Sequence, residues 1–232
     1  MYEIKVPPIF QKERDQIDCR NDDISGFEAA QESLLEKTKS PDPKIASIAF
    51  GLLSEIQYWK GETAHEHEKK MLYEKGAEMG MEGSKQNETC IHSHFWTAVN
   101  MGLLGLHKGI LENLFMLDKL LHYSKKSLTL EETYFHGGPH RVMGYLYFKL
   151  PPWPISSGDN QKAIHHLTKA LEYGPSFFLN HYYMAEVYMH IGKKDEARKH
   201  FQWMVDAEED KRYFDSESRL KNEARKKLSI LH

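Results

Sequence analysis

The chain has 232 residues and a net charge of −3 at pH 7, and 40% of its residues are hydrophobic. This composition is rich enough in apolar side chains for a folded core and excludes a disordered chain. It also excludes general nucleic-acid binding, because there is no excess of lysine and arginine to neutralise phosphates. No run of about 18 apolar residues could span a membrane, and Cys19 and Cys90 predict no disulfide framework.

The first forty residues predict an irregular start followed by one helix. Residues 1–20 are expected to be irregular apart from a short helix at about 9–18, because the two prolines before it oppose an earlier start. Asp22 or Asp23 is placed to cap the helix that follows.

Two longer helices are predicted between residues 43 and 79. Asp42 followed by Pro43 predicts the start of the first helix. Apolar residues then recur at helical spacing to about residue 59, and Gly61 is expected to end the helix. A more weakly amphipathic helix at 62–79 and a polar loop at 80–89 follow.

Two apolar helices come after this loop. The first contains Phe95 and Trp96, and a short turn at Gly109 separates it from the second. The second carries a wide apolar stripe from Ile110 to Leu121, which predicts burial on more than one side.

The stretch from His136 to Tyr147 predicts a turn and then a helix with Pro139 at its first position. Its side chains have the spacing of the first helix of a tetratricopeptide repeat, and those of the next helix match the second half. The matching residues are His140, Met143, Gly144, Tyr147, Ala163, Leu167, Ala170 and Pro175. Between the halves, Pro151–Gly158 forms an extended insertion, after which Asp159 is placed to cap the returning helix.

The last repeat keeps the signature spacing without an insertion, from His181 to Phe201. A largely charged helix at about 216–231 is predicted to cap the array. We therefore expect an all-α, tetratricopeptide-like α-solenoid of about four helix hairpins, with a half-pair at the front. It should form a single helical-repeat domain over residues 1–232.

Several motifs in this order resemble the T-component proteins associated with TRAP transporters, the TatT family. The resemblance covers roughly residues 25–230, and its most specific parts are the Gly137–Gly144 block and the proline-rich insertion. The matching stretches are Tyr73–Glu78, Phe95–Trp96, Asn100–Gly102, Lys108–Leu111, Gly137–Gly144, Lys149–Pro151, Ser157–Asp159 and Ala163.

The resemblance implies a non-catalytic protein without a cofactor. Members of this family are periplasmic or lipid-anchored repeat proteins that work beside a solute-binding protein of a membrane transporter. No apolar leader is visible at the N-terminus, so the sequence as it stands predicts a cytoplasmic location. A periplasmic location is the alternative if the chain is a trimmed mature region.

Binding residues follow from the positions that face the concave groove in a repeat of this kind. The groove is aromatic and methionine-rich, which suits a partner helix or an amphipathic small ligand. The alternative is that these aromatic residues pack between the repeats. The predicted binding residues are Thr97, Met101, Arg141, Tyr145, Phe148, Lys149, Tyr182, Glu186 and Met189 at these positions, together with Trp153 of the insertion.

Arg141 and Trp153 each have two interpretations. Arg141 lies in the first turn of a helix, where the dipole disfavours a cation. It is explained either by an anion bound at the free N–H groups of residues 138–141 or by an ion pair with a nearby carboxylate. Trp153, within the insertion, belongs either to a partner-docking loop or to a cover over the end of the hairpin.

The fourteen histidines raise the hypothesis of a metal-dependent enzyme. His65 and His67 would point about 200° apart on a helix, so they cannot share an ion there. His92 and His94 have no obvious third ligand. We expect no metal site and no enzymatic activity. A cytosolic adaptor that binds a peptide or a helix of another protein remains the main alternative function.

Overall fold

The computed structural model describes residues 4–107, 110–152 and 156–231, and the regular structure in these residues is helical. The chain divides into two compact units, residues 4–131 and residues 132–232. The sequence predicts one domain without an internal boundary, whereas the structure separates at residues 131 and 132. The N-terminal unit (4–131) and the C-terminal unit (132–231) are therefore described separately.

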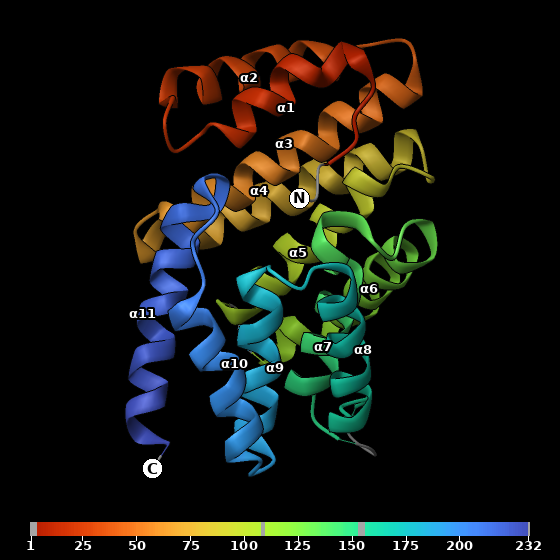
Figure 1. Cartoon of the computed structure of the whole chain (residues 1–232). Coiled ribbons are helices and arrows are strands. Elements are labelled where there is room, and N and C mark those ends of the chain that lie inside the picture. The colour runs from red at the N-terminus through yellow and green to blue at the C-terminus, as the bar shows by residue number, and fades with distance from the viewer. Residues whose placement is uncertain (1–3, 108–109, 153–155, 232) are drawn as a thin grey trace. The chain divides into compact units, whose positions relative to one another are not determined.

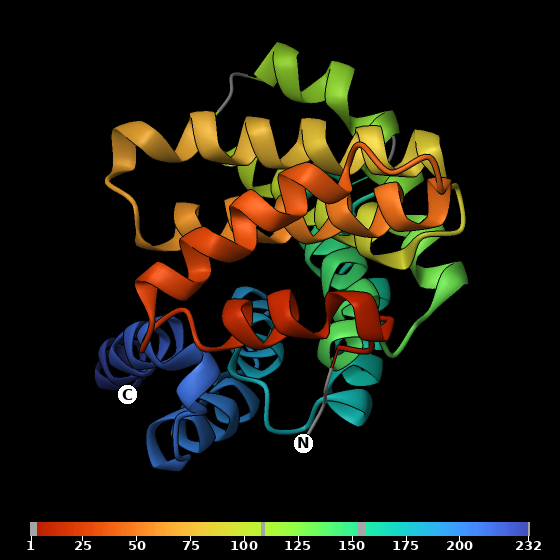
Figure 2. The same cartoon turned by 90° about the horizontal axis from the view of Figure 1, so that it is seen from above.

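The N-terminal unit consists of three antiparallel helix pairs (Figure 1). A short 3₁₀ helix, Pro8–Phe10, precedes them. Each helix packs against the next, and α3 also contacts α5; Figure 2 shows α3 and α4 side by side. The helices are α1 Gln11–Asp18, α2 Ile24–Lys37, α3 Pro43–Thr63, α4 Glu66–Gln86, α5 Ile91–Leu106 and α6 Ile110–Leu130. The predicted half-pair at the front is thus a full pair, α1 and α2.

The predicted helix starts in this unit are confirmed by their caps. The Asp23 carboxylate accepts a hydrogen bond from the Gly26 N–H at 2.9 Å. Asp42 accepts one from the Lys44 N–H at 2.9 Å, and Pro43 occupies the first turn of α3. Both aspartates satisfy N–H groups that have no partner inside the helix.

Two predicted helix ends are wrong for one reason. α3 continues through Gly61 to Thr63, and α4 continues through the predicted loop to Gln86. A side chain at residue 61 would collide with the Tyr73 ring, so Gly61 permits a close approach between α3 and α4. Gly80 and Gly83 serve the same purpose on α4, where side chains would collide with Thr97 and Ser93 of α5. Glycine here marks close packing between helices and does not end them.

Small and hydroxyl side chains complete this contact between α3, α4 and α5. The Ser54 hydroxyl donates to the carbonyl of Gly76 at 2.7 Å. The Ser93 hydroxyl donates to the carbonyl of Ser47 at 2.8 Å, and the Asn100 amide donates to the carbonyl of Ser54 at 2.9 Å. The buried polar groups are therefore tied to backbone, which fixes the register of the three helices.

Gly51→Ala tests this packing directly. A Cβ at residue 51 would lie 2.6 Å from the His92 Cβ and 2.7 Å from the Ser93 backbone nitrogen. Because backbone cannot rotate away, α5 must shift, and we expect a loss of about 1–3 kcal/mol in the free energy of unfolding. Gly102→Ala, on α5 with open space at its Cβ position, is the matched control; it should stabilise by about 0.5–1 kcal/mol. Equal effects in a urea unfolding measurement would contradict the tight contact.

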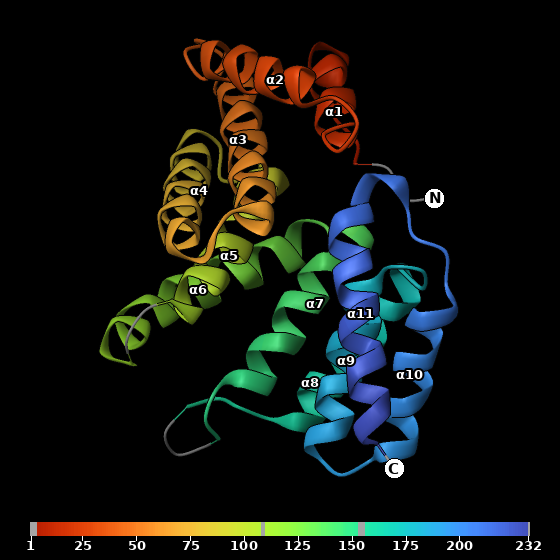
Figure 3. The ribbon, with the colours of Figure 1, turned by 90° about the vertical axis from the view of Figure 1, so that its left-hand side faces the viewer.

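The C-terminal unit contains two helix pairs and a final single helix. α7 pairs with α8 and α9 with α10, and α11 packs on both α9 and α10 (Figure 3). A 3₁₀ helix, Lys211–Tyr213, leads into α11. The helices are α7 Tyr134–Lys149, α8 Asn160–Tyr173, α9 Phe178–His190, α10 Lys194–Asp206 and α11 Phe214–Ile230.

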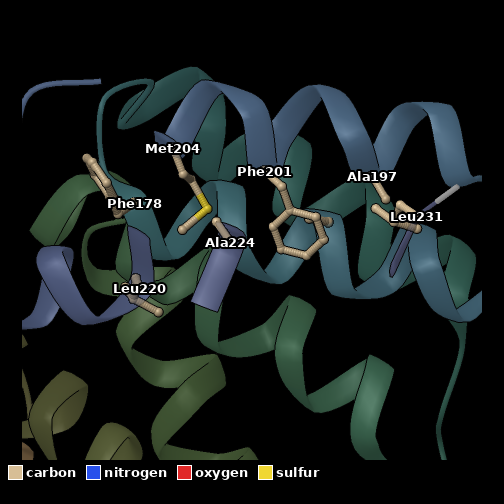
Figure 4. Packing of buried hydrophobic residues seen from close by; sticks show 8 residues of the cluster. Phe178, Ala197, Phe201, Met204, Leu220, Ala224 and Leu231 are labelled. Carbon is tan, nitrogen blue, oxygen red and sulfur yellow. The ribbon is translucent and has the colours of Figure 1, made fainter. Parts of the chain in front are cut away.

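The core of this unit forms where α9, α10 and α11 meet. Phe178, Phe201 and Met204 are almost completely buried and point into the same cluster as Leu220 and Ala224 of α11 (Figure 4). α11 thus covers the apolar face that α9 and α10 leave open. This confirms the predicted helix at about 216–231 and its packing on the last repeat.

The observed start of α8 agrees with the start predicted from the sequence. The Asp159 carboxylate accepts hydrogen bonds from the backbone N–H groups of Gln161 and Lys162. At the other end, Gly174 follows α8 directly, and Pro175 prevents its continuation. The part of the insertion that contains Trp153 lies outside the described residues.

Candidate functional site

A left-handed turn precedes the regular part of α7. Phe135, His136 and Gly137 have φ angles of 46°, 58° and 72°. The left-handed region costs a residue with a side chain about 1–2 kcal/mol, so Phe135 and His136 must be held there by their surroundings. Both are buried, at 2% and 6% exposure. The predicted turn is thus present, and right-handed helix begins at Gly138, which leaves Pro139 in the first turn.

Arg141 and Asn180 hold this turn in place. The Arg141 guanidinium donates to the carbonyl oxygens of Phe135 and His136, and to the Asn180 side-chain oxygen at 3.0 Å. It also lies 4.6 Å from the centre of the Phe177 ring. The Asn180 amide donates to the carbonyls of His136, Ala170 and Gly174 at 2.9–3.0 Å. One amide therefore ties the turn to the C-terminal end of α8.

This geometry corrects the expectation that Arg141 faces a binding groove. The residue is only 5% exposed, and its guanidinium donates hydrogen bonds to the carbonyl oxygens of the left-handed turn. These interactions account for a cation in the first turn of α7. The sequence predicted only a bound anion or an ion pair with a carboxylate. The Arg141 charge also contributes, after burial, to lowering the pKa of His136 to about 3.

α7 and α9 together carry an aromatic strip, which we define as Tyr145, Phe148, Lys149, Tyr183 and His190. The Tyr145 and Tyr183 rings stack with centroids 4.4 Å apart, and Phe148 meets His190 edge-on at 5.4 Å. The Lys149 ammonium lies 4.4 Å from the centre of the Phe148 ring. Lys149 and His190 are exposed, and the other three are half-buried. The strip spans α7 and α9, and Tyr183, which the sequence prediction missed, connects them.

The predicted residues of α9 lie beside the strip, toward α11. The Glu186 carboxylate pairs with the Lys227 ammonium of α11 at 2.8 Å. Tyr182 and Met189 pack against the cluster around Phe201 and remain half-buried. The structure therefore brings these residues close to the strip, but it also gives each of them a packing or pairing role.

Burial changes the acidity of the two tyrosines predicted for the groove. It raises the pKa of Tyr145 to about 12, with smaller contributions from Tyr182 and Glu186. It also raises the pKa of Tyr182 to about 12, and the negative charge of Glu186 adds to the effect. Both hydroxyls therefore stay protonated at physiological pH, and they can donate a hydrogen bond to a partner.

The remaining predicted binding residues do not join this surface. Thr97 and Met101 of α5 belong to the interior of the N-terminal unit, with 0% and 4% exposure. The Thr97 hydroxyl donates to the carbonyl of Ser93 at 2.6 Å, within its own helix. The sequence projection failed here because α5 is covered on one side by α4 and on another by α3. Trp153 lies outside the described residues.

A groove of about 710 Å³ lies between α4 and α6 in the N-terminal unit. Its lining carries charges of both signs, from the carboxylates of Glu78, Glu82 and Asp118 and the ammonium groups of Lys85 and Lys119. Among the described residues, no three histidine, cysteine, aspartate or glutamate side chains gather closely enough to hold a metal ion. His65 precedes α4 as its N-cap, and its ring stacks on that of His67 with centroids 6.0 Å apart.

Comparisons with known proteins identify the fold. Residues 155–220 match the family model described as tetratricopeptide repeat. The chain is similar to the crystal structure of a thermophilic TPR protein of Thermus thermophilus, with 17% sequence identity and a TM-score of 0.63 over 94% of this chain and 100% of that chain. No curated protein matches the chain. In the described part of the chain, no helix is long and apolar enough to cross a membrane.

These similarities confirm the predicted fold class. The helix pairs of the C-terminal unit follow the tetratricopeptide spacing found in the sequence, and α11 packs on the last of them. Helical repeats of this kind are typical of scaffolds that bind other proteins on an extended surface. The chain has an all-α, tetratricopeptide-like helical-repeat fold.

Proposed function

We propose that this protein is a non-catalytic scaffold and that its aromatic strip binds a segment of a partner protein. The observation that carries the proposal is the set of ring contacts across α7 and α9, one stacked and one edge-on, beside the exposed Lys149 and His190. Aromatic side chains with polar tips are enriched in protein interfaces, because they bury a large area and still donate hydrogen bonds.

The charges around the strip favour a particular kind of segment. Glu186 already pairs with Lys227 at 2.8 Å, whereas Lys149 projects from the exposed end of α7 over Phe148. A partner segment with an apolar side chain beside a carboxylate would pack on the rings and pair with this ammonium. An amphipathic helix or a short extended peptide with that pattern meets both requirements.

The resemblance to TRAP-transporter T-components supports a finer proposal. Under it, the partner is a solute-binding protein, and the complex assists solute uptake. An amphipathic small molecule bound on the same rings is compatible with this role. The alternative, an adaptor that binds a peptide or a helix in the cytosol, uses the same surface with a different partner.

A pull-down with the double variant Phe148→Ala/Lys149→Glu tests the proposed surface. We expect the wild type to retain at least one protein from a lysate of the source cells and the variant to retain at least about tenfold less of it. That loss corresponds to removing one aromatic contact and reversing one charge at an interface. Quantitative mass spectrometry of the retained proteins and of extractable small molecules provides the measurement.

Lys199→Glu is the matched control, because Lys199 is exposed on α10 and lies outside the strip. It should retain the partner at the wild-type level, and circular dichroism should show the same helix content for all three proteins. If the double variant retains every partner as the wild type does, the strip is not the binding surface. If the retained protein is not a solute-binding protein, the TRAP-related role fails while the scaffold proposal stands.

A further inference from the structure

Two histidine pairs occupy equivalent places in the C-terminal unit. The Nδ1 atoms of His140 on α7 and His166 on α8 lie 2.9 Å apart. The Nδ1 atoms of His181 on α9 and His200 on α10 lie 3.1 Å apart. In each repeat, the pair therefore links the first helix to the second. One ring of each pair, His140 or His181, is buried, and the other is half-buried.

The surroundings of the two pairs also correspond. Tyr147 follows His140 by seven positions and stacks on His166, with centroids 5.5 Å apart. Tyr188 follows His181 by the same spacing and stacks on His200 at 5.8 Å. The arrangement is therefore a repeated unit of two imidazoles and a tyrosine.

The hydrogen-bond partner of Nε2 determines which nitrogen of each buried ring, His140 or His181, carries the proton. The Nε2 of His181 is 2.8 Å from the carbonyl oxygen of Pro175, which can only accept, so this nitrogen carries the hydrogen. The Nε2 of His140 donates in the same way to the Glu132 carboxylate at 3.0 Å. In the neutral rings, each Nδ1 is then an acceptor, and the Nδ1–H of His166 or His200 donates to it.

This geometry sets a limit on the protons that each pair can hold. One added proton leaves a hydrogen bond between the two Nδ1 atoms, because one of them can still accept. A second added proton places an N–H on both atoms, and two donors with like charges then face each other across about 3 Å. The hydrogen bond between the helices is lost, and the charges repel.

We propose that the two imidazole pairs make the C-terminal repeats acid-sensitive, because each pair contributes a hydrogen bond between α7 and α8, or between α9 and α10, only until it gains a second proton. Acidification would then loosen both repeats together. The helices that part, α7 and α9, also carry the aromatic strip. Binding on the strip would therefore weaken with acid, but the proposal for the pairs does not depend on that function.

Other titratable groups near the pairs either favour or oppose protonation of the imidazoles. The lowered pKa of Glu132 keeps its carboxylate ionised beside His140, with Tyr173 as a second donor. Near His166 are His165 and, 5.5 Å from the Tyr147 ring, the Lys162 ammonium. The positive charge of Lys199 acts on His200, and the Lys193 ammonium lies 6.0 Å from the Tyr188 ring. Apart from Glu132, these charges oppose further protonation.

The sign of the pH dependence of stability follows from the lowered pKa values of His166 and His200. Burial, aided by the partner ring, lowers the pKa of His166 to about 4 and that of His200 to about 4. In the unfolded chain both rings titrate near 6.5. Stability is therefore fully present above pH 6.5 and is lost as pH falls toward 4. Glu217 opposes this trend, because burial raises its pKa to about 7, so the histidines must be tested by a difference between variants.

Hydrogen exchange on the full chain measures this difference. The variant His166→Gln/His200→Gln keeps an amide donor opposite each Nδ1 but cannot gain a proton. Between pH 7.5 and 5.0, the protection factors of α7–α10 should fall at least about tenfold more in the wild type than in the variant. The helices of the N-terminal unit provide an internal reference, and His67→Gln, at an exposed histidine of α4 in that unit, should behave as the wild type.

An equal loss of protection in the wild type and the double variant would overturn the proposal. If the double variant does not fold at pH 7.5, nitrogen NMR of the wild type decides instead. Two couplings between Nδ1 nuclei, transmitted through the N–H···N bonds, should be present at pH 7.5 and should be lost as the pH falls through about 4. Their absence at pH 7.5, or their undiminished intensity well below pH 4, would also overturn it.

Discussion

Arg14→Ala should reduce the free energy of unfolding by about 3–5 kcal/mol, the largest effect expected for a single substitution in the N-terminal unit. The Arg14 guanidinium on α1 pairs with the Glu55 carboxylate on α3 at 2.6 Å and with Asp18 at 2.8 Å. The side chains of Arg14 and Glu55 are 3% and 0% exposed. Removing the cation therefore leaves a carboxylate in the interior with the indole N–H of Trp59 as its neighbour at 3.1 Å.

Urea unfolding followed by circular dichroism measures the loss, and hydrogen exchange should place it in α1–α3. The double variant Arg14→Met/Glu55→Met should recover at least half of it, because apolar residues of similar volume replace both buried charges. Lys39→Ala, which removes a pair whose side chains are 70% and 74% exposed, is the surface control and should cost less than about 1 kcal/mol. A loss below that value for Arg14→Ala would show that the pair does not hold α1 to α3.

The sequence predicted the fold well where local chemistry determines the structure. Asp42, Asp159 and one of the pair Asp22 and Asp23 were identified as helix caps because a carboxylate before an apolar periodic stretch satisfies free N–H groups. In the structure Asp42 and Asp159 do so, and Asp23 is the cap of its pair. The repeat from His181 to Phe201 could also be predicted from its tetratricopeptide spacing. Its small residues, Ala185 and Ala197, are buried where helices meet.

Features that depend on a distant neighbour could not be predicted in this way. Gly61 and Gly80 have the same local signal as a helix end, and only Tyr73 and Thr97 on the adjacent helices show that they permit close packing. Thr97 and Met101 have the spacing of groove residues, but other helices cover them. The histidine pairs were missed because their members are separated by an insertion in one repeat and not in the other.

In the candidate binding surface, too, some positions follow from local helical spacing and others depend on tertiary contacts. Tyr145, Phe148 and Lys149 were placed on one face of α7 by helical spacing alone, and the structure keeps them together. Arg141 has the same spacing, yet it lies inside because the left-handed turn at Phe135–Gly137 folds its carbonyl oxygens toward the guanidinium. A left-handed turn at non-glycine residues has no reliable sequence signal, since tertiary contacts hold it.

Asn180→Ala should destabilise the C-terminal unit by about 3 kcal/mol because its side chain connects this turn to both helix pairs. The amide is 0% exposed and donates to three carbonyls, and its oxygen accepts from Arg141. The carbonyls keep other donors, so each neutral bond is worth about 1 kcal/mol, and the bond to the cation is worth more. Hydrogen exchange should show the loss in α7–α10 and not in α3–α5. Asn222→Ala, at an exposed asparagine on α11, should change stability by less than about 0.5 kcal/mol; a similar effect for both substitutions would mean that the turn is held by apolar packing alone.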